Sequence, residues 1–169
     1  MESGLSNKKA CGPDDLQAFM KQYNIPGEIV HLDAPTPTVE TAAAAVGAEA
    51  EQIVKSLLFQ VGDEVALAIT CGTLRVENRV LASRFGVGRK KVEMADAETV
   101  LNATGYEIGG VPPIGHVRAF PTFIDPRVLD QDEVYAGGGG GHALVRLNPQ
   151  DILEHSHAEV LDLHTLPEA

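Results

Sequence analysis

Hydrophobic residues recur with a helical period in several separate segments of the chain. Leu16, Phe19, Met20 and Tyr23 follow the spacing i, i+3, i+4, i+7, which predicts an amphipathic helix that ends near Asn24. Four more helices are expected where a capping residue or a glycine bounds an apolar face: 39–46, 77–85, 97–104 and a last helix that starts at 148–149. The small apolar face of the second helix suits close packing against a sheet.

Between these helices, short apolar runs predict strands. They cover residues 28–32, 53–61, 65–71, 121–126, 134–136, 142–147 and 160–163. The tripeptide Gly62-Asp63-Glu64 joins two of these runs and predicts a tight hairpin. The run Gly137–Gly141 also separates two strands, so we expect either a hairpin or a close approach of two backbones there.

Lys55 interrupts a strand of mainly apolar residues, 53–61. An alternation of period two places it on the same face as Ile53, Leu57 and Phe59. Burial without a partner disfavours an ammonium, so either its pKa falls or its head ends at a polar cavity where a group accepts its protons. The alternative is a lysine at the strand entrance whose stem lies on the core while its head reaches water.

A second unusual segment is Ile108–His116, which contains three glycines and two consecutive prolines. Such a backbone cannot form an ordinary helix or a central strand, and it predicts a rigid loop. Several amides of this loop have no ladder to join, and free amides on a kinked backbone can bind an anion or a developing oxyanion. The alternative is a tight connection that carries a solvated histidine.

The composition of the chain narrows these possibilities. With 169 residues and 44% hydrophobic composition, one domain with a proper core is expected. The first twenty residues have no signal-peptide pattern and no apolar run reaches the length of a membrane span, so we expect a soluble, cytoplasmic protein. Cys11 and Cys71 are too few for a disulfide framework, and the histidines show no metal-binding spacing, so no metal and no cofactor are expected.

Charge is distributed unevenly along the chain. The net charge of −11 argues against general nucleic-acid binding. Residues 75–91, however, carry six basic side chains against the single acid Glu77, so this stretch has a net charge of +5 and the remainder −16. A small, oriented phosphate contact fits this pattern, and the alternative is a solvated helix face.

Four ordered motifs together closely resemble the YbaK family of free-standing relatives of the prolyl-tRNA synthetase editing domain. They are residues 53–59, 92–96, 104–106 and 109–115, and the resemblance extends over about residues 14–163. It implies a single α+β domain over residues 13–169, with a bent mixed β-sheet, open and barrel-like, flanked by helices. Residues 1–12 are expected to be a disordered N-terminus.

The resemblance also implies the activity, which is hydrolysis of mischarged aminoacyl-tRNA in trans. An aminoacyl ester is already activated, so attack by water or by a group of the substrate needs mainly orientation and oxyanion stabilisation. In such proteins the pocket for the aminoacyl group is lined by the lysine that corresponds to Lys55 and by the glycine-rich loop that corresponds to residues 109–116. We therefore expect Lys55, Gly115 and His116 to be catalytic. The expected substrate-binding residues are Gly109, Gly110, Val111, Pro112, Pro113 and Ile114, and the expected tRNA contacts are Arg89, Lys90 and Lys91.

Two departures from the family pattern concern the substrate. Members that act on cysteine attached to proline tRNA carry an aromatic residue near Leu32 and an acid after the second glycine motif, and here that motif contains no acid. Leu32, Gly138, Gly139 and His142 are still candidates for the pocket lining, with an ordinary exposed strand-end histidine as the alternative for His142. Proline tRNA mischarged with a small amino acid such as Cys or Ala is the expected substrate, and prolyl-tRNA synthetase a candidate partner.

Two other classes of function compete with a deacylase. One is a catalytically silent module that binds charged tRNA or a synthetase. The other is a DNA-binding protein, which the overall charge and the lack of a base-reading recognition helix disfavour. Neither cysteine is expected to act as a nucleophile, and Cys71 is predicted to be a small core residue.

Overall fold

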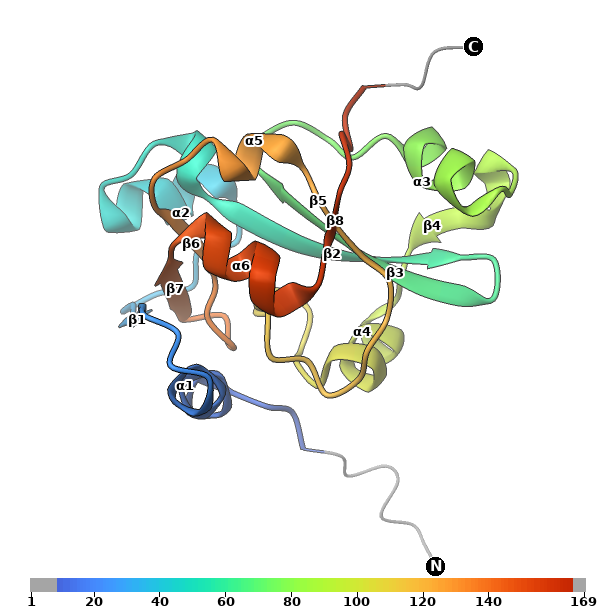
Figure 1. The fold of residues 1–169 in the computed structure, drawn as a ribbon. Coiled ribbons are helices and arrows are strands. Elements are labelled where there is room, and N and C mark those ends of the chain that lie inside the picture. The colour runs from blue at the N-terminus through green and yellow to red at the C-terminus, as the bar shows by residue number, and fades with distance from the viewer. Residues whose placement is uncertain (1–8, 166–169) are drawn as a thin grey trace, which may run out of the picture.

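A long antiparallel hairpin runs through the middle of the molecule (Figure 1). In this computed structural model, which describes residues 9–165, β2 (Val54–Val61) and β3 (Glu64–Cys71) pair along all eight residues. Their two-residue turn places Gly62 at φ +61°, a conformation that glycine adopts without steric cost. The hairpin expected from the two apolar runs is confirmed.

The hairpin belongs to the larger of two sheets. The larger has the order β4–β2–β3–β5–β8, with β4 (Val92–Met94), β5 (Thr122–Ile124) and β8 (Glu159–Val160). Its β3–β5 and β5–β8 pairs are parallel, so the sheet is mixed as expected. The smaller sheet is antiparallel in the order β1–β7–β6, with β1 (Glu28–His31), β7 (Ala143–Leu147) and β6 (Val134–Gly137).

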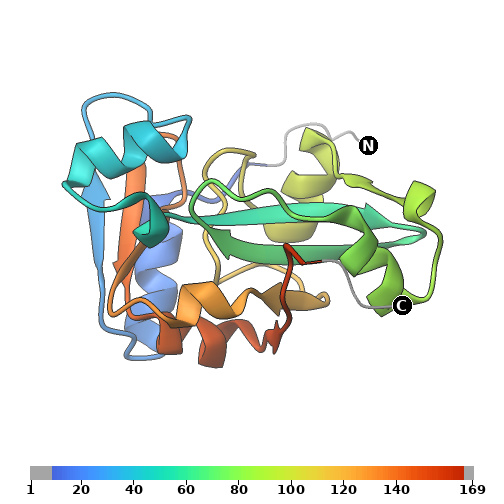
Figure 2. The same cartoon turned by 90° about the horizontal axis from the view of Figure 1, so that it is seen from above.

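The two sheets meet at a single parallel bridge between Ile53 and Tyr135. The expected bend in the mixed sheet corresponds to this junction between two open sheets. The α+β class is confirmed. Figure 2 shows α2 over one end of the hairpin and α3 over the other end.

Six α-helices and two short 3-10 helices surround the sheets within residues 9–165. The α-helices are α1 (Pro13–Gln22), α2 (Val39–Val46), α3 (Asn78–Phe85), α4 (Ala97–Thr104), α5 (Pro126–Leu129) and α6 (Pro149–Ser156), and the 3-10 helices are η2 (Ala50–Gln52) and η3 (Arg89–Lys91). The caps follow the sequence closely. The side chains of Thr38, Asp96 and Asn148 accept the expected N-terminal amides, and glycines in the left-handed conformation end α2, α3 and α4.

Several details differ from the sequence-based expectations, which also did not include the strand β4. Asp125 caps the short helix α5, where only a turn was expected, because its carboxylate accepts from the Arg127 amide. The last strand pairs at Glu159–Val160, so it begins one residue earlier than the expected range 160–163 and ends at the first residue of that range. Of the segment expected to be disordered, residues 1–8 lie outside the described part, whereas the Cys11 amide donates to the Gly105 carbonyl at 2.7 Å.

The alternation of the hairpin gives each of its faces a separate core. Val54 and Leu58 face the main cluster, which includes the fully buried Leu16 and Tyr106. Phe59 and its neighbours on the opposite face pack against α3. Because β2 is covered on both faces, an opening along its edge gives direct access to the interior. None of the helices in residues 9–165 is long and apolar enough to cross a membrane.

Candidate active site

The edge of β2 that faces away from β3 is only partly paired. It is bridged to Tyr135 at Ile53 and pairs with β4 from Phe59 onward. At this end the Ala95 amide also donates to the Leu58 carbonyl at 3.0 Å. Within the described part of the chain, residues 54–57 therefore have no strand partner on this edge, which we call the open edge. Because antiparallel ladders alternate, the backbone N–H and C=O of Ser56 point toward it.

A cavity of about 210 Å³ lies against the open edge. Four segments that are far apart in the sequence form its walls. They are residues 36–39 with Ala42, residues 53–58, a group formed by Met94, Ala95, Val100, Ile108, Gly109 and Val111, and a group formed by Gly137, Gly140, Gly141, Ala143 and Leu144. Lys55 is the only ionisable residue among these lining residues. The rest of the lining is apolar side chain, hydroxyl and backbone.

Two glycine segments meet backbone to backbone in one wall of this cavity. A Cβ atom added to Gly110 would lie 2.7 Å from the Gly140 backbone, and one added to Gly137 would lie 2.4 Å from the Val111 carbonyl oxygen. The Gly139 amide also donates to the Gly110 carbonyl at 2.9 Å. The glycine run after β6 is therefore both a hairpin and a close backbone approach, the two alternatives expected from the sequence.

Lys55 is half-buried and lines the cavity from β2. No hydrogen bond or ion pair joins its ammonium to another residue within the described range 9–165. A lysine that is partly withdrawn from water and has no protein partner can donate to a bound ligand. The structure thus places Lys55 where the sequence predicted, at a cavity.

Ser56 is a second polar group in this cavity, and no pattern in the sequence selects it. Its Oγ atom is buried and has no hydrogen-bond partner among the described residues. Buried hydroxyls are normally paired, because an unpaired one loses its hydrogen bonds to water. Lys55 and Ser56 are thus two consecutive polar residues of the cavity lining whose side chains have no partner among the described residues.

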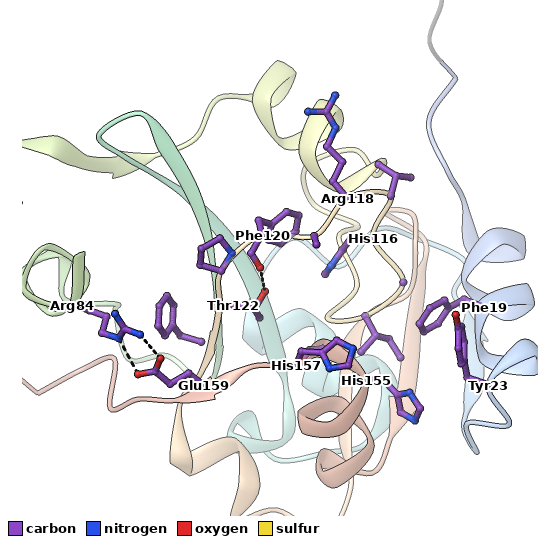
Figure 3. Close-up of a pocket in the computed structure, with 17 residues that line it drawn as sticks. Phe19, Tyr23, Arg84, His116, Arg118, Phe120, Thr122, His155, His157 and Glu159 are labelled. Carbon is purple, nitrogen blue, oxygen red and sulfur yellow. Dashed lines mark hydrogen bonds and ion pairs between the residues drawn. The ribbon is translucent and has the colours of Figure 1, made fainter. Parts of the chain in front are cut away.

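Gly115 and His116 do not share this cavity with Lys55. Together with Ile114 they line a second, larger cavity of about 540 Å³ beside α1 and α6, where Phe19, Tyr23, Arg118, Phe120 and His155 are also found (Figure 3). The whole segment 109–116 was expected to line one pocket, and this expectation is wrong because the segment is divided between two cavities. The buried Pro112 and Pro113 carry the chain from one cavity to the other.

The state of His116 follows from its surroundings. Its Nε2 atom donates to the Pro112 carbonyl at 2.7 Å, and burial lowers the pKa of the ring below its usual value. The imidazole is therefore neutral at pH 7, with the proton on Nε2. It holds the loop in shape, and it lies in the second cavity rather than near the Lys55 ammonium.

The remaining predicted residues lie around the Lys55 cavity without lining it. Leu32 and His142 are joined through their backbones, since the Leu32 amide donates to the His142 carbonyl at 2.8 Å, and the His142 side chain is exposed. The Gly138 amide donates to the Ala143 carbonyl at 3.0 Å, so Gly138 belongs to the hairpin. Thr36, Pro37 and Thr38 line the cavity although no sequence signal selected them.

The basic residues Arg89, Lys90 and Lys91 form the exposed helix η3 at the tip of the hairpin. The Gly62 amide donates to the Lys91 carbonyl at 2.9 Å, which fixes η3 beside the turn. β4 begins at the next residue and ends at Met94, which lines the cavity. A single short strand therefore connects the basic residues to the candidate site.

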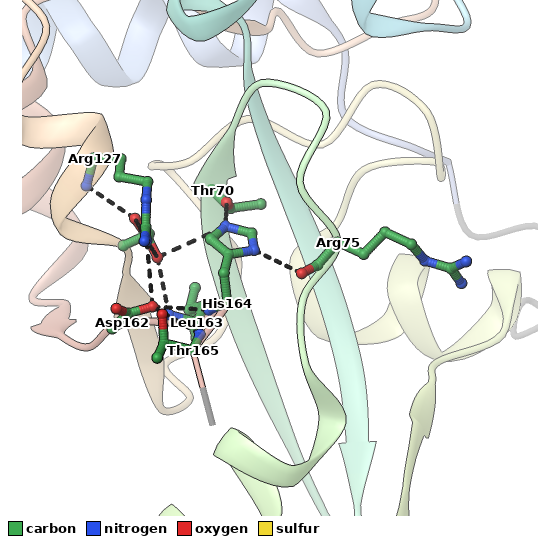
Figure 4. Close-up of polar contacts among 8 residues, drawn as sticks. Thr70, Arg75, Arg127, Asp162, Leu163, His164 and Thr165 are labelled. Atoms are coloured by element: carbon green, nitrogen blue, oxygen red, sulfur yellow. Dashed lines mark hydrogen bonds and ion pairs between the residues drawn. The ribbon is translucent and has the colours of Figure 1, made fainter. Parts of the chain in front are cut away.

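A third polar grouping lies away from both cavities, and we call it the C-terminal clasp (Figure 4). The fully buried carboxylate of Asp125 accepts from the Leu163 amide at 2.9 Å and from the Arg127 guanidinium at 3.1 Å. His164 donates from Nδ1 to the Arg75 carbonyl, and its Nε2 lies 2.6 Å from the Thr70 hydroxyl. The clasp fastens the segment after β8 across β3.

Within residues 9–165, neither cavity contains a thiol. Cys71 is buried, as predicted, and burial raises the pKa of its thiol to about 11. Burial also raises the pKa of Cys11. The one grouping of three possible metal ligands found in this part of the chain, Asp151, Glu154 and His155, belongs to α6 and has no residue in the Lys55 cavity. The polar groups that the described residues present to this cavity are therefore Lys55, hydroxyls and backbone.

The fold and the site together define a class of protein. It is a small α+β protein whose cavity combines one lysine with a glycine-rich backbone wall and, among the described residues, lacks a paired nucleophile and base. Such a site suits a substrate that is already activated, because orientation and hydrogen bonding are then sufficient.

The chain belongs to the aminoacyl-tRNA editing domain family, whose sequence model matches residues 33–155. It is 30% identical over 146 residues to the uncharacterized protein YwhH of Bacillus subtilis, with 86% of this chain and 91% of YwhH covered. It is 28% identical over 147 residues to EbsC of Enterococcus faecalis, described as a proposed Cys-tRNA(Pro)/Cys-tRNA(Cys) deacylase, with 86% and 85% covered.

A solved structure extends this similarity to three dimensions. A crystal structure described as a proposed trans-editing enzyme for prolyl tRNA synthetase superimposes with a TM-score of 0.83 and 35% identity, covering 90% of this chain and 96% of the other. Proline–tRNA ligase of Shouchella clausii is 33% identical over 113 residues, which is 66% of this chain but only 19% of the ligase. The chain therefore resembles one region of that synthetase.

Proposed function

We propose that this protein hydrolyses the ester bond of mischarged aminoacyl-tRNA in trans. The observation that carries the proposal is the Lys55 ammonium, which has no partner in residues 9–165 and lines a closely walled cavity in a member of the editing family. The cytoplasm, where translation takes place, is the proposed site of action, and prolyl-tRNA synthetase is a candidate partner.

In the proposed mechanism the aminoacyl group enters the cavity beside the open edge. Lys55 donates to the ester carbonyl or to the ribose of the terminal adenosine and holds the ester in place. A water molecule attacks the carbonyl carbon, and its oxygen becomes part of the carboxylate of the released amino acid. The bond to the ribose oxygen then breaks, and that oxygen leaves with a proton as the free hydroxyl of the tRNA.

Backbone amides of the glycine-proline loop are the proposed oxyanion donors. Gly109 and Val111 line the same cavity as Lys55, and their amides donate to no acceptor within the described residues. This assignment replaces the one made for Gly115 and His116, which line the other cavity. Amides fixed in position before the reaction stabilise developing negative charge at little cost in reorganisation.

The size and lining of the cavity support a small amino acid as the one removed. A volume of about 210 Å³ is smaller than that of typical pockets for drug-sized ligands, about 300–1,000 Å³. No acidic side chain in residues 9–165 lines the cavity, so the α-ammonium of the substrate would bind to Ser56 Oγ and to carbonyls of the open edge. We propose proline tRNA carrying Cys or Ala as the substrate.

The test replaces Lys55 with methionine, which keeps most of the stem volume and removes the charge. Because the ammonium has no protein partner in residues 9–165, we expect the melting temperature to stay equal or rise slightly. Single-turnover hydrolysis of mischarged tRNA is expected to fall at least about a hundredfold. Lys21→Met, on the exposed surface of α1, is the matched control.

A panel of tRNAs, each charged with a small non-cognate amino acid, identifies the substrate in the same assay. Full activity of a folded Lys55→Met variant would place the site elsewhere. If the wild-type protein binds charged tRNA and hydrolyses no member of the panel, the protein is a binding module.

A further inference from the structure

Two large apolar side chains are exposed at the mouth of the Lys55 cavity. Met94 is 51% exposed and Ile108 is 56% exposed, and both line this cavity. Other exposed large apolar side chains in residues 9–165, such as Leu74 at 49% and Val160 at 47%, line neither this cavity nor the larger one. Apolar side chains gathered at the mouth of a polar site often contact a ligand.

The backbone holds both side chains in fixed positions. Met94 is the last residue of β4 and pairs with Phe59, while the next amide, that of Ala95, donates to the Leu58 carbonyl at 3.0 Å. Ile108 precedes Gly109, and the Gly110 amide closes the turn by donating to the Glu107 carbonyl at 3.1 Å. The two side chains are therefore presented by ordered backbone.

The size of the cavity determines which part of the substrate they can contact. About 210 Å³ accommodates a small aminoacyl group but leaves no room for a nucleoside as well. The nucleoside esterified to that group must then lie at the mouth, where Met94 and Ile108 are exposed.

The charge nearby supports the same placement. η3 carries three basic residues and immediately precedes β4, so about 10 Å of extended strand separates Lys91 from Met94. A nucleic acid strand whose last nucleoside lies on Met94 can therefore reach η3 with its preceding phosphates. The rest of the protein is acidic, which restricts favourable phosphate contacts to this side.

We propose that Met94 and Ile108 form a platform that binds the flat face of the terminal purine nucleoside of the substrate, an inference that rests on the proposed function. A polarizable thioether packs well on an aromatic ring, and every base has such a face. Neither side chain offers a strong hydrogen-bonding group, so the platform recognises the ring face and not the base edge. The amino acid is selected inside the cavity, and the nucleoside is held outside it.

The experiment compares two esters of the same amino acid, the 3′-ester of adenosine and the methyl ester. For Met94→Ala and Ile108→Ala, kcat/KM for the adenosine ester is expected to fall about fivefold, in line with the loss of a thioether or apolar contact with an aromatic ring face. The ratio of kcat/KM for the adenosine ester to kcat/KM for the methyl ester should fall by the same factor. The change should appear as a higher KM for the adenosine ester. The matched controls are Leu74→Ala and Val160→Ala, which truncate equally exposed side chains elsewhere.

The ratio of kcat/KM for the two esters supports or overturns the platform. A ratio in Met94→Ala and Ile108→Ala that equals the ratio in the wild type and the controls would overturn it. If the wild type hydrolyses neither ester, the proposed function fails separately. Binding of aminoacyl-adenosine with an amide in place of the ester is then measured for the same proteins, and equal affinity in all of them would overturn the platform.

Discussion

At the scale of single residues, Ser56 is the most informative side chain beside Lys55. Its hydroxyl is buried and has no partner within the described residues, an arrangement that costs free energy in the folded protein. A position that is unfavourable for stability is expected where a side chain serves a bound ligand.

We therefore expect Ser56→Ala to leave the free energy of unfolding unchanged or to raise it by up to about 1 kcal/mol. If Ser56 Oγ binds the α-ammonium of the substrate, KM should rise about tenfold, the loss of one hydrogen bond to a charged group. Urea unfolding and steady-state deacylation measured on one preparation check both effects. Equal KM in a folded variant would show that Ser56 does not contact the substrate.

Of the two polar residues that line the cavity from β2, the sequence singles out Lys55 and not Ser56 for a physical reason. A lysine inside an apolar alternation conflicts with its surroundings, and the conflict is visible in the sequence. A serine in a strand is common and gives no such signal. Gly115 and His116 were assigned to the wrong cavity because the direction taken by the chain after Pro112 and Pro113 depends on packing with distant segments.

At the scale of elements, the contact between the two glycine segments shapes the wall of the site. Gly110 and Gly137 approach other backbone atoms so closely that a Cβ atom has no space. Local patterns predicted nearly every helix and strand, because caps and alternation are local. They predicted only that the glycine run could approach another backbone, since the identity of the partner segment is not local information.

Gly137→Ala should separate the two glycine segments, because the new Cβ would lie 2.4 Å from the Val111 carbonyl oxygen. We expect a loss of about 1–3 kcal/mol in the free energy of unfolding, as for other overpacked positions, together with weaker substrate binding. The control is Gly88→Ala, where a Cβ atom meets nothing within 4 Å. Equal stability of the two variants would contradict the described close approach.

At the scale of the whole molecule, the distribution of charge is expected to affect both tRNA binding and the stability of the fold at low pH. The basic helix η3 stands on an otherwise acidic chain with a net charge of −11. At the end of β3 that lies away from the hairpin turn, the C-terminal clasp contains carboxylates that bind amides and Arg127.

Alanine at Arg89, Lys90 and Lys91 together should weaken tRNA binding and flatten its dependence on salt. Each phosphate that the protein no longer neutralises lowers the slope by roughly 0.7–0.9 units, so the slope of the triple variant should fall by about two units or more. Filter binding between low and moderate salt measures this slope. The exposed Lys21→Ala variant should keep the wild-type slope, and an unchanged slope in the triple variant would make η3 an ordinary solvated surface.

The clasp predicts a loss of stability in acid. The backbone amide of His164, with further hydrogen bonds, lowers the pKa of Asp162 to about 2 from its ordinary value of 3.8. A lowered pKa stabilises the fold above the unfolded value, and this contribution is lost as the pH falls from about 4 toward 2. Because Asp162 is partly exposed, we expect about 1 kcal/mol or less.

Urea unfolding of Asp162→Asn at several pH values checks this expectation. The variant should be less stable than the wild type near pH 6, and the difference should shrink toward pH 2. Asp132→Asn, at an exposed position outside the clasp, serves as the control. A difference that stays constant between pH 6 and pH 2 would rule out the proposed role of the Asp162 carboxylate.

The four walls of the Lys55 cavity have a consequence for the order of events in folding. They come from segments between Thr36 and Leu144, and the hairpin that supports them pairs with β5, which pairs in turn with β8. Contacts between such distant segments form late and slowly. During synthesis the cavity cannot exist before the ribosome has released residue 144, so a growing chain cannot bind aminoacyl-tRNA there, and after refolding catalytic activity should return only when the last sheet contacts have formed.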